Sequence, residues 1–93
     1  MANVRHQKPK LKGDVSTLFN LYTQNAVIDT KALKTAFGIS PNTALRAIRL
    51  CKTEAQKKGI VFYTQDNEVP TNHFFSFYGW DIEQIAQAYK MTQ

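Results

Sequence analysis

Residues 37–41 read Phe-Gly-Ile-Ser-Pro, and this short stretch carries the signals for the end of one helix and the start of the next. Glycine adopts a left-handed backbone more easily than any other residue, so Gly38 is suited to end a helix. A serine hydroxyl can accept from the backbone N–H groups of the following turn, and proline is favoured at the first helical position. Ser40-Pro41 therefore begins a second helix. The sequence predicts two helices joined by a tight turn of four residues, 37–40.

Helical periodicity extends to both sides of this turn. Asp29 or Thr30 can cap the preceding helix, whose apolar residues are Ala32, Leu33, Ala36 and Phe37. The following helix meets no breaker before Gly59 and is expected over residues 41–58. Its apolar residues form one face: Ala44, Ala47 or Ile48, Cys51 and Ala55.

The flanking segments complete the pattern of elements. Asp14 is placed to cap a helix over residues 15–25, and residues 26–28 form a short apolar link. Residues 60–64 are rich in β-forming residues, and Glu68-Val69 can return through a turn at 65–67 to make a small hairpin.

Two further helical segments are expected near the C-terminus. Residues 71–78 form a short one that stops at Gly79, and Asp81 begins a last helix that runs to about Lys90. The apolar side of this last helix carries Ile82, Ile85, Ala86 and Tyr89.

A chain of 93 residues has room for one hydrophobic core. We expect a mainly α fold with a small β-hairpin, namely a winged or wing-like helix-turn-helix of four to five helices. Residues 1–13 contain Pro9 and Gly13 without apolar periodicity and are expected to form a flexible basic arm. Residues 14–93 then make up the single domain.

Basic residues are concentrated in two parts of the chain, whose net charge is +5. Residues 1–12 carry four basic residues and no acid, and residues 30–59 carry seven basic residues against Glu54 alone. Charge distributed in this way is typical of proteins that bind polyanions, with nucleic acid favoured over an anionic membrane surface. A lipid-surface role is also disfavoured because the basic residues do not share a helix with a broad apolar face.

The second helix of the pair resembles a known family signature. Residues 40–49, Ser-Pro-Asn-Thr-Ala-Leu-Arg-Ala-Ile-Arg, resemble the recognition helix of bacterial winged helix-turn-helix regulators of the GntR type. The chain is also similar to small excisionase-like proteins of phages and integrative mobile elements, through residues 57–63 and Val69-Pro70. The sequence departs from the pattern at Lys34, where a small buried residue is usual, and in the length of the 41–58 helix, which runs about two turns further.

This resemblance implies a sequence-specific protein that binds double-stranded DNA, either a small transcriptional regulator or a recombination directionality factor. Such a protein acts in the cytoplasm of a bacterial or phage-infected cell. One recognition helix reads only a few base pairs, so a homodimer or a cooperative array is expected on DNA.

The residue types on the 41–58 helix suit this task independently of the family. With the apolar face turned inward, Asn42, Arg46 and Arg49 fall on the outward side, where Arg can pair with guanine and Asn with adenine. Backbone contacts are expected from Lys31, Ser40, Thr43, Lys52, Lys57 and Lys58. Arm contacts to phosphates or to a minor groove are expected from Arg5, Lys8, Lys10 and Lys12. The alternative is that these residues only solvate an amphipathic surface.

Aromatic residues gather late in the sequence, at Phe62, Tyr63, Phe74, Phe75, Phe77, Tyr78, Trp80 and Tyr89. Hydrophobic core is the favoured interpretation, because a small domain needs large side chains to fill it. Part of the cluster, namely Phe75, Tyr78 and Trp80, is the alternative candidate for a surface that binds a protein partner. On that interpretation the chain is a phage or mobile-element inhibitor or adaptor.

The sequence gives no support for catalysis or for a cofactor. One cysteine and two histidines cannot supply a four-ligand zinc site, and no phosphate-binding glycine motif is present. Cys51 and His73 could pair as nucleophile and base, but Cys51 falls on the inward face of its helix. We therefore expect no enzyme, no metal, no membrane span and a reducing compartment.

Overall fold

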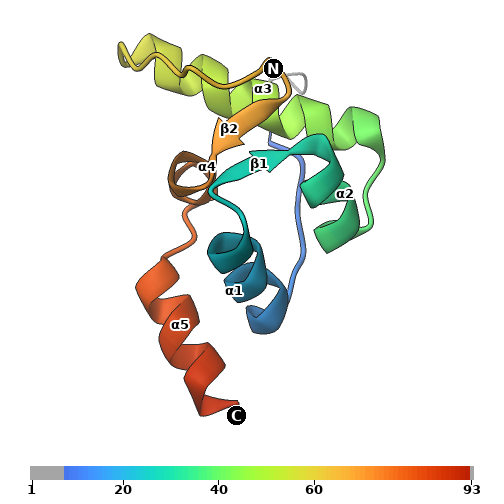
Figure 1. Ribbon diagram of the computed structural model, residues 1–93, viewed down its shortest axis with the longest axis vertical. Helices are drawn as coiled ribbons and strands as arrows, with labels where there is room; N and C mark the ends of the chain where they lie inside the picture. Colours follow the sequence, from blue (N-terminus) through green and yellow to red (C-terminus); the bar gives the residue numbers. More distant parts are fainter. Residues whose placement is uncertain (1–7, 93) are drawn as a thin grey trace, which may run out of the picture.

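The computed structural model describes residues 8–92, in which five helices and two short strands follow one another (Figure 1). Their order is α1 (Val15–Gln24), β1 (Val27–Asp29), α2 (Thr30–Phe37), α3 (Pro41–Lys57), β2 (Glu68–Pro70), α4 (Thr71–Tyr78) and α5 (Ile82–Met91). The expected fold class is confirmed: the chain is mainly helical, with a small antiparallel sheet and a helix-turn-helix formed by α2 and α3.

Local capping sets the ends of these helices as the sequence predicts. The side chains of Asp14, Asp29, Ser40 and Asp81 each accept a hydrogen bond from a backbone N–H in the first turn of the helix that follows. Gly38 ends α2 with a φ of 65°, in the left-handed region that a side chain would disfavour. The turn between α2 and α3 is therefore fixed by residues inside it.

The small sheet joins segments that are distant in sequence, and here the prediction is wrong. Residues 26–28 are not a link, because Val27–Asp29 forms β1 and pairs antiparallel with β2, with Ile28 opposite Val69. Residues 60–64 form no strand, so the expected hairpin over 60–69 is absent from residues 8–92. The sheet instead places two fully buried β-branched side chains, Ile28 and Val69, against the core.

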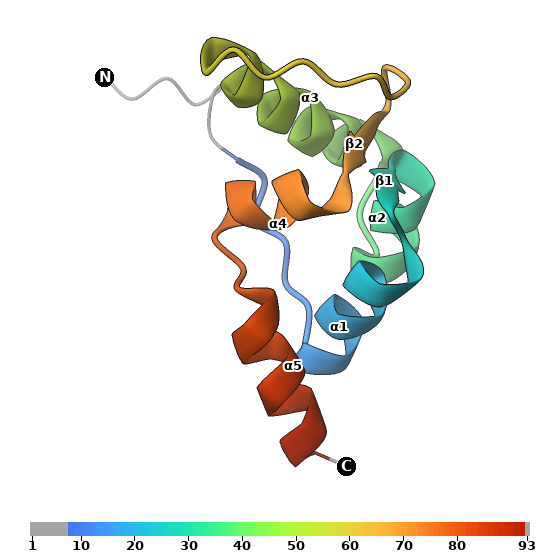
Figure 2. The ribbon, with the colours of Figure 1, turned by 60° about the vertical axis from the view of Figure 1, so that its left-hand side comes forward.

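The loop between α3 and β2 runs back along α3 (Figure 2). We call residues 58–67 the wing-like segment, because they lie beside the second helix of the helix-turn-helix in the place where a wing hairpin was expected. Their side chains alternate between partly buried and exposed from Ile60 to Thr64, and the ring of Phe62 packs edge-on against His73 with centroids 4.8 Å apart. One side of the segment therefore rests on the body of the protein.

The core lies between α3 and the layer formed by the sheet, α2 and α4. Its fully buried large side chains are Ile28, Leu33, Ile48, Val69 and Phe74. The inner face of α3 adds Ala44 and Ala47, whose small side chains leave room for the facing elements. Lys34 is exposed, so the unusual residue at this position of α2 does not disturb the packing of α2 on α3.

Residues 8–13 are packed on the protein, which corrects the expectation of a flexible arm for this part, and residues 1–7 of the expected arm lie outside the described residues. Pro9 is buried, and its carbonyl accepts a hydrogen bond of 2.6 Å from the Tyr78 hydroxyl. Leu11 packs against the core. Gly13 lies so close to α2 that an added Cβ would meet Phe37 Cε1 at 2.8 Å. Hydrogen bonding and burial therefore hold residues 9–13 in place.

Helix α5 extends the molecule away from α3 (Figure 1). It packs on α1, where the rings of Phe19 and Tyr89 stack with centroids 4.2 Å apart, and none of its residues is fully buried. Within residues 8–92 no helix combines the length and apolar character that crossing a membrane requires.

Candidate nucleic-acid interface

The outward side of α3 lies at one end of the long axis of the molecule (Figure 1). Ala44, Ala47, Ile48, Cys51 and Ala55 face the core, which leaves the opposite side of the helix to solvent. The exposed residues on that side are Asn42, Arg46, Arg49, Thr53 and Gln56. We call this surface the α3 face.

Asn42, Arg46 and Arg49, which the sequence predicts as base-reading residues, lie together on the α3 face. They occupy successive turns, and at 1.5 Å per residue the distance from the first to the last along the axis is about 10 Å. A major groove about 12 Å wide accommodates such a row. Within residues 8–92, neither Asn42 nor Arg46 has a side-chain hydrogen bond or ion pair, so both polar groups are available to a ligand.

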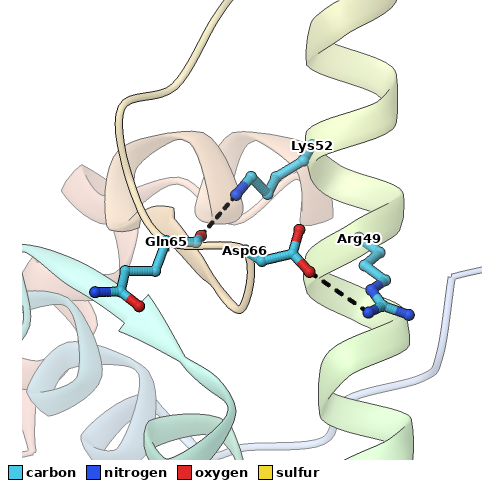
Figure 3. Close-up of polar contacts among 4 residues, drawn as sticks. All are labelled: Arg49, Lys52, Gln65 and Asp66. Carbon is cyan, nitrogen blue, oxygen red and sulfur yellow. Dashed lines mark hydrogen bonds and ion pairs between the residues drawn. The ribbon is translucent and has the colours of Figure 1, made fainter.

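Arg49 differs from the other two because it has an acidic neighbour. Its Nη2 lies 3.6 Å from Oδ2 of Asp66, in the wing-like segment (Figure 3). This carboxylate could not be predicted, because no local pattern in the sequence relates position 66 to position 49. The pair depends on how the wing-like segment is placed against α3.

The hydroxyl groups at the start of α3 are engaged with each other. Ser40 Oγ accepts from the backbone N–H of Thr43 at 3.1 Å and donates to Thr43 Oγ1 at 2.9 Å. These bonds satisfy donors of the first helical turn. The hydroxyl proton of Thr43 remains free to donate to a phosphate, whereas Ser40 serves the cap.

The lysines expected to contact the DNA backbone occupy different environments. Lys52 donates to the carbonyl of Gln65 at 2.8 Å, and Lys57 lies 3.5 Å from Glu54 one turn earlier on α3. Lys58 is exposed at the end of α3. Lys31 is exposed at the start of α2, where it lines a groove of about 540 Å³ between α1 and α2. Lys52 and Lys57 therefore lie beside the α3 face, whereas Lys58 lines grooves with Ser76 and Phe77 of α4 and Lys31 belongs to α2.

The arm residues are not gathered at the α3 face. The ammonium group of Lys8 donates to the Phe77 carbonyl at 2.7 Å and lies 4.8 Å from the centroid of the Phe77 ring. Lys10 and Lys12 are exposed, but their segment runs from α4 toward the start of α1, away from α3 (Figures 1 and 2). Arg5 lies outside the described residues. A minor-groove contact by Lys10 and Lys12 beside α3 does not agree with this path, whereas Lys8 lines a groove with Leu50 and Glu54 of α3.

The proposed partner surface is core rather than surface at its centre. Phe75 is only 2% exposed, and Trp80 packs edge-on against it with ring centroids 5.1 Å apart. Tyr78 is half-buried, and burial raises the pKa of its hydroxyl to about 12. The interpretation of Phe75 as a contact for a protein partner is therefore wrong, and the adaptor alternative loses its central residue.

Two strongly exposed apolar side chains lie in the wing-like segment instead, and a third, Met91, lies at the end of α5. Tyr63 is 97% exposed and Val61 is 69% exposed. In the sequence, residues 60–64 show only a β-forming composition, which predicts a strand and does not indicate that these two side chains are exposed. These two residues extend the exposed surface next to α3.

Cys51 has a structural environment. It is buried, its Sγ lies 3.7 Å from the carbonyl oxygen of His73, and burial raises the pKa of its thiol to about 11. A thiol that stays protonated at neutral pH is a poor nucleophile. In the part of the chain that the structure describes, no three His, Cys, Asp or Glu side chains are grouped so as to hold a metal ion.

Comparison of the chain with protein-family models, with curated proteins and with solved structures finds no match. Arguments about its function therefore rest on the α3 face and the residues around it.

Proposed function

We propose that the protein binds double-stranded DNA sequence-specifically, with α3 in the major groove. The observation that carries this proposal is the row of Asn42, Arg46 and Arg49, exposed on one side of the second helix of a helix-turn-helix. The helix is anchored on its other side by five buried residues. A rigid helix that presents side chains of this kind meets the geometric requirement for reading base edges.

The chemistry of the row fits base recognition. A guanidinium group can donate to both N7 and O6 of guanine, and an asparagine amide can pair with N6 and N7 of adenine. Lys52 and Lys57 lie further along α3 beside the row and supply positive charge for phosphates. Part of the basic middle of the sequence, the part carried by α3, thus lies on or beside the surface that would read bases, whereas Lys31 and Lys34 belong to α2.

The size of the α3 face indicates how the protein would bind its site. A row about 10 Å long matches about three base pairs at 3.4 Å each. Three base pairs give too little discrimination for a regulatory site, so two or more copies would occupy adjacent half-sites. The roles that fit a protein of this size are a small transcriptional regulator or a recombination directionality factor, in the cytoplasm of a bacterial or phage-infected cell.

The experiment that tests the proposal is selection of bound duplexes from a random pool, followed by affinity measurements on the selected site. The Arg46→Ala variant should lose about 1–3 kcal/mol of binding free energy on that site. Lys90→Ala is the matched control, because it removes one positive charge from exposed α5 at the other end of the molecule. Affinity should also fall with salt, with a slope of about −0.9 for each phosphate contacted.

Two results would contradict the proposal. One is the absence of any bound duplex at low salt with micromolar folded protein. The other is an equal loss of affinity in Arg46→Ala and Lys90→Ala, since that would show a response to net charge alone.

A further inference from the structure

The tip of the wing-like segment is held against the side of α3 by two neighbouring contacts (Figure 3). The carbonyl of Gln65 accepts from Lys52 Nζ at 2.8 Å, and the carboxylate of Asp66 lies 3.6 Å from Arg49 Nη2. Arg49 and Lys52 are three residues apart, so they lie on the same side of α3. The contacts therefore match two consecutive residues of the tip to two consecutive turns of the helix.

The position of Asp66 is set by the backbone around it rather than by the ion pair. The N–H of Glu68 donates to the Gln65 carbonyl at 3.0 Å, and the N–H of Gln65 donates to the Glu68 carboxylate at 3.2 Å. Glu68 then continues directly into β2, where it pairs with Asp29 of β1. A turn closed in this way and joined to the sheet holds the backbone of Asp66 beside α3, within reach of Arg49.

The ion pair itself adds little to folding stability. The side chain of Asp66 is 90% exposed and that of Arg49 is 61% exposed. Exposed pairs of this kind contribute little because water screens both charges. The pair instead has a local effect: the positive charge of Arg49 on the α3 face lies next to the negative charge of Asp66 in the wing-like segment.

An anion at this place affects the two kinds of DNA contact differently. A guanidinium group has five N–H donors, so an ion pair with Asp66 leaves enough donors for N7 and O6 of a guanine. A phosphate that approaches Arg49 meets the negative charge of Asp66 and is repelled. Base contacts remain available to Arg49, whereas phosphate contacts are weakened.

We propose that Asp66 is a specificity-determining residue that positions Arg49 for a base edge and disfavours its use on phosphates. Asp66 acts through Arg49 and need not touch DNA itself. This inference rests on the proposed function, and it adds a device that lowers binding to non-specific duplex.

The test measures affinity for the selected site and for a shuffled duplex of the same composition, over a range of salt concentrations. Asp66→Asn keeps the shape of the side chain and removes its charge. We expect affinity for the shuffled duplex to rise about fivefold, which corresponds to one charge interaction at 4 Å in water. The salt slope on that duplex should steepen by about 0.9, the value for one additional phosphate contact. The ratio of specific to non-specific affinity should fall.

Three further variants separate this role from a general effect of charge. Glu83→Gln makes the same change in net charge on exposed α5 and should leave the specificity ratio at the wild-type value. Asp66→Glu restores the carboxylate and should recover most of the ratio. In an Arg49→Ala background, Asp66→Asn should no longer change the ratio, because the residue it positions is absent.

The outcomes distinguish the inference from the proposed function. If the wild type binds no duplex, the proposed function fails and the role of Asp66 fails with it. If the wild type discriminates but Asp66→Asn changes both duplexes by the same factor as Glu83→Gln, only the role of Asp66 is overturned. An effect of Asp66→Asn on the ratio that persists without Arg49 also overturns the positioning role, since the carboxylate would then act directly.

Discussion

Replacing Tyr78 by phenylalanine removes a single oxygen atom at the end of α4, and we expect this change to weaken the attachment of the N-terminal segment. The Tyr78 hydroxyl donates to the carbonyl of Pro9 at 2.6 Å. This bond fastens residues 9–13 across the body of the protein. Without the hydroxyl, the Pro9 carbonyl loses its hydrogen-bond donor while Pro9 itself remains buried.

The size of the effect follows from the environment of the bond. A hydrogen bond between neutral groups contributes about 0.5–1.5 kcal/mol net, because folding exchanges it for a bond to water. Tyr78 is half-buried, which places its bond within that range rather than above it. We expect Tyr78→Phe to lower the free energy of unfolding by about 1 kcal/mol. For a domain of this size, that corresponds to a fall in Tm of about 4–8 °C.

The assay is urea and thermal unfolding followed by circular dichroism, on the wild type and two variants. Tyr63→Phe is the matched control, because Tyr63 is 97% exposed and removal of its hydroxyl should change stability by less than about 0.5 kcal/mol. If Tyr78→Phe is as stable as Tyr63→Phe, the N-terminal segment is not held by this bond and the packing described for residues 9–13 is refuted.

Three other expectations concern stability. Burial raises the pKa of Cys51 to about 11 and that of Tyr78 to about 12, above their ordinary values of 9 and 10, so the unfolded chain releases these protons first. Their contribution to stability is therefore complete below pH 9 and is lost as pH rises to 12. The urea midpoint of the wild type should fall over this pH range, and that of Tyr78→Phe should fall less steeply. Ser40→Ala removes the acceptor for the Thr43 N–H and should cost about 1 kcal/mol in urea unfolding, whereas Ser40→Gly should cost less. Phe75→Ala empties a core position and should cost about 3–5 kcal/mol in the same assay; a cost below about 1 kcal/mol would favour Phe75 as a surface residue.

The helices and their caps could be predicted because the interactions that define them lie within one turn. Ser40 and Thr43 are three residues apart, as are Asp29 and Ala32, and each pair is joined by a cap hydrogen bond. Gly38 stops α2 through its own backbone preference. The inward face of α3 follows from helical spacing alone, and this also placed Asn42, Arg46 and Arg49 on the outward side.

The pairing of strands could not be predicted in this way. Residues 60–64 have the composition of a strand, yet the partner of β2 is β1, which is separated from it by α2, α3 and the wing-like segment. The choice depends on which pairing buries more apolar surface, and Ile28 and Val69 are both completely buried in the observed one. The composition of a segment indicates whether it favours an extended backbone, but it does not indicate which strand it pairs with.

The sequence by itself determined where the helices begin and end, which side of α3 is buried, and which basic and amide side chains α3 presents to solvent, because all of these depend on residues within a few positions of one another. The tertiary structure was needed to show that residues 9–13 are packed, that Phe75 is core and not a partner surface, and that Asp66 lies beside Arg49. Each of these depends on contacts between segments far apart in the chain, and such contacts form only where burial and hydrogen bonding offset the entropy of closing the intervening loops.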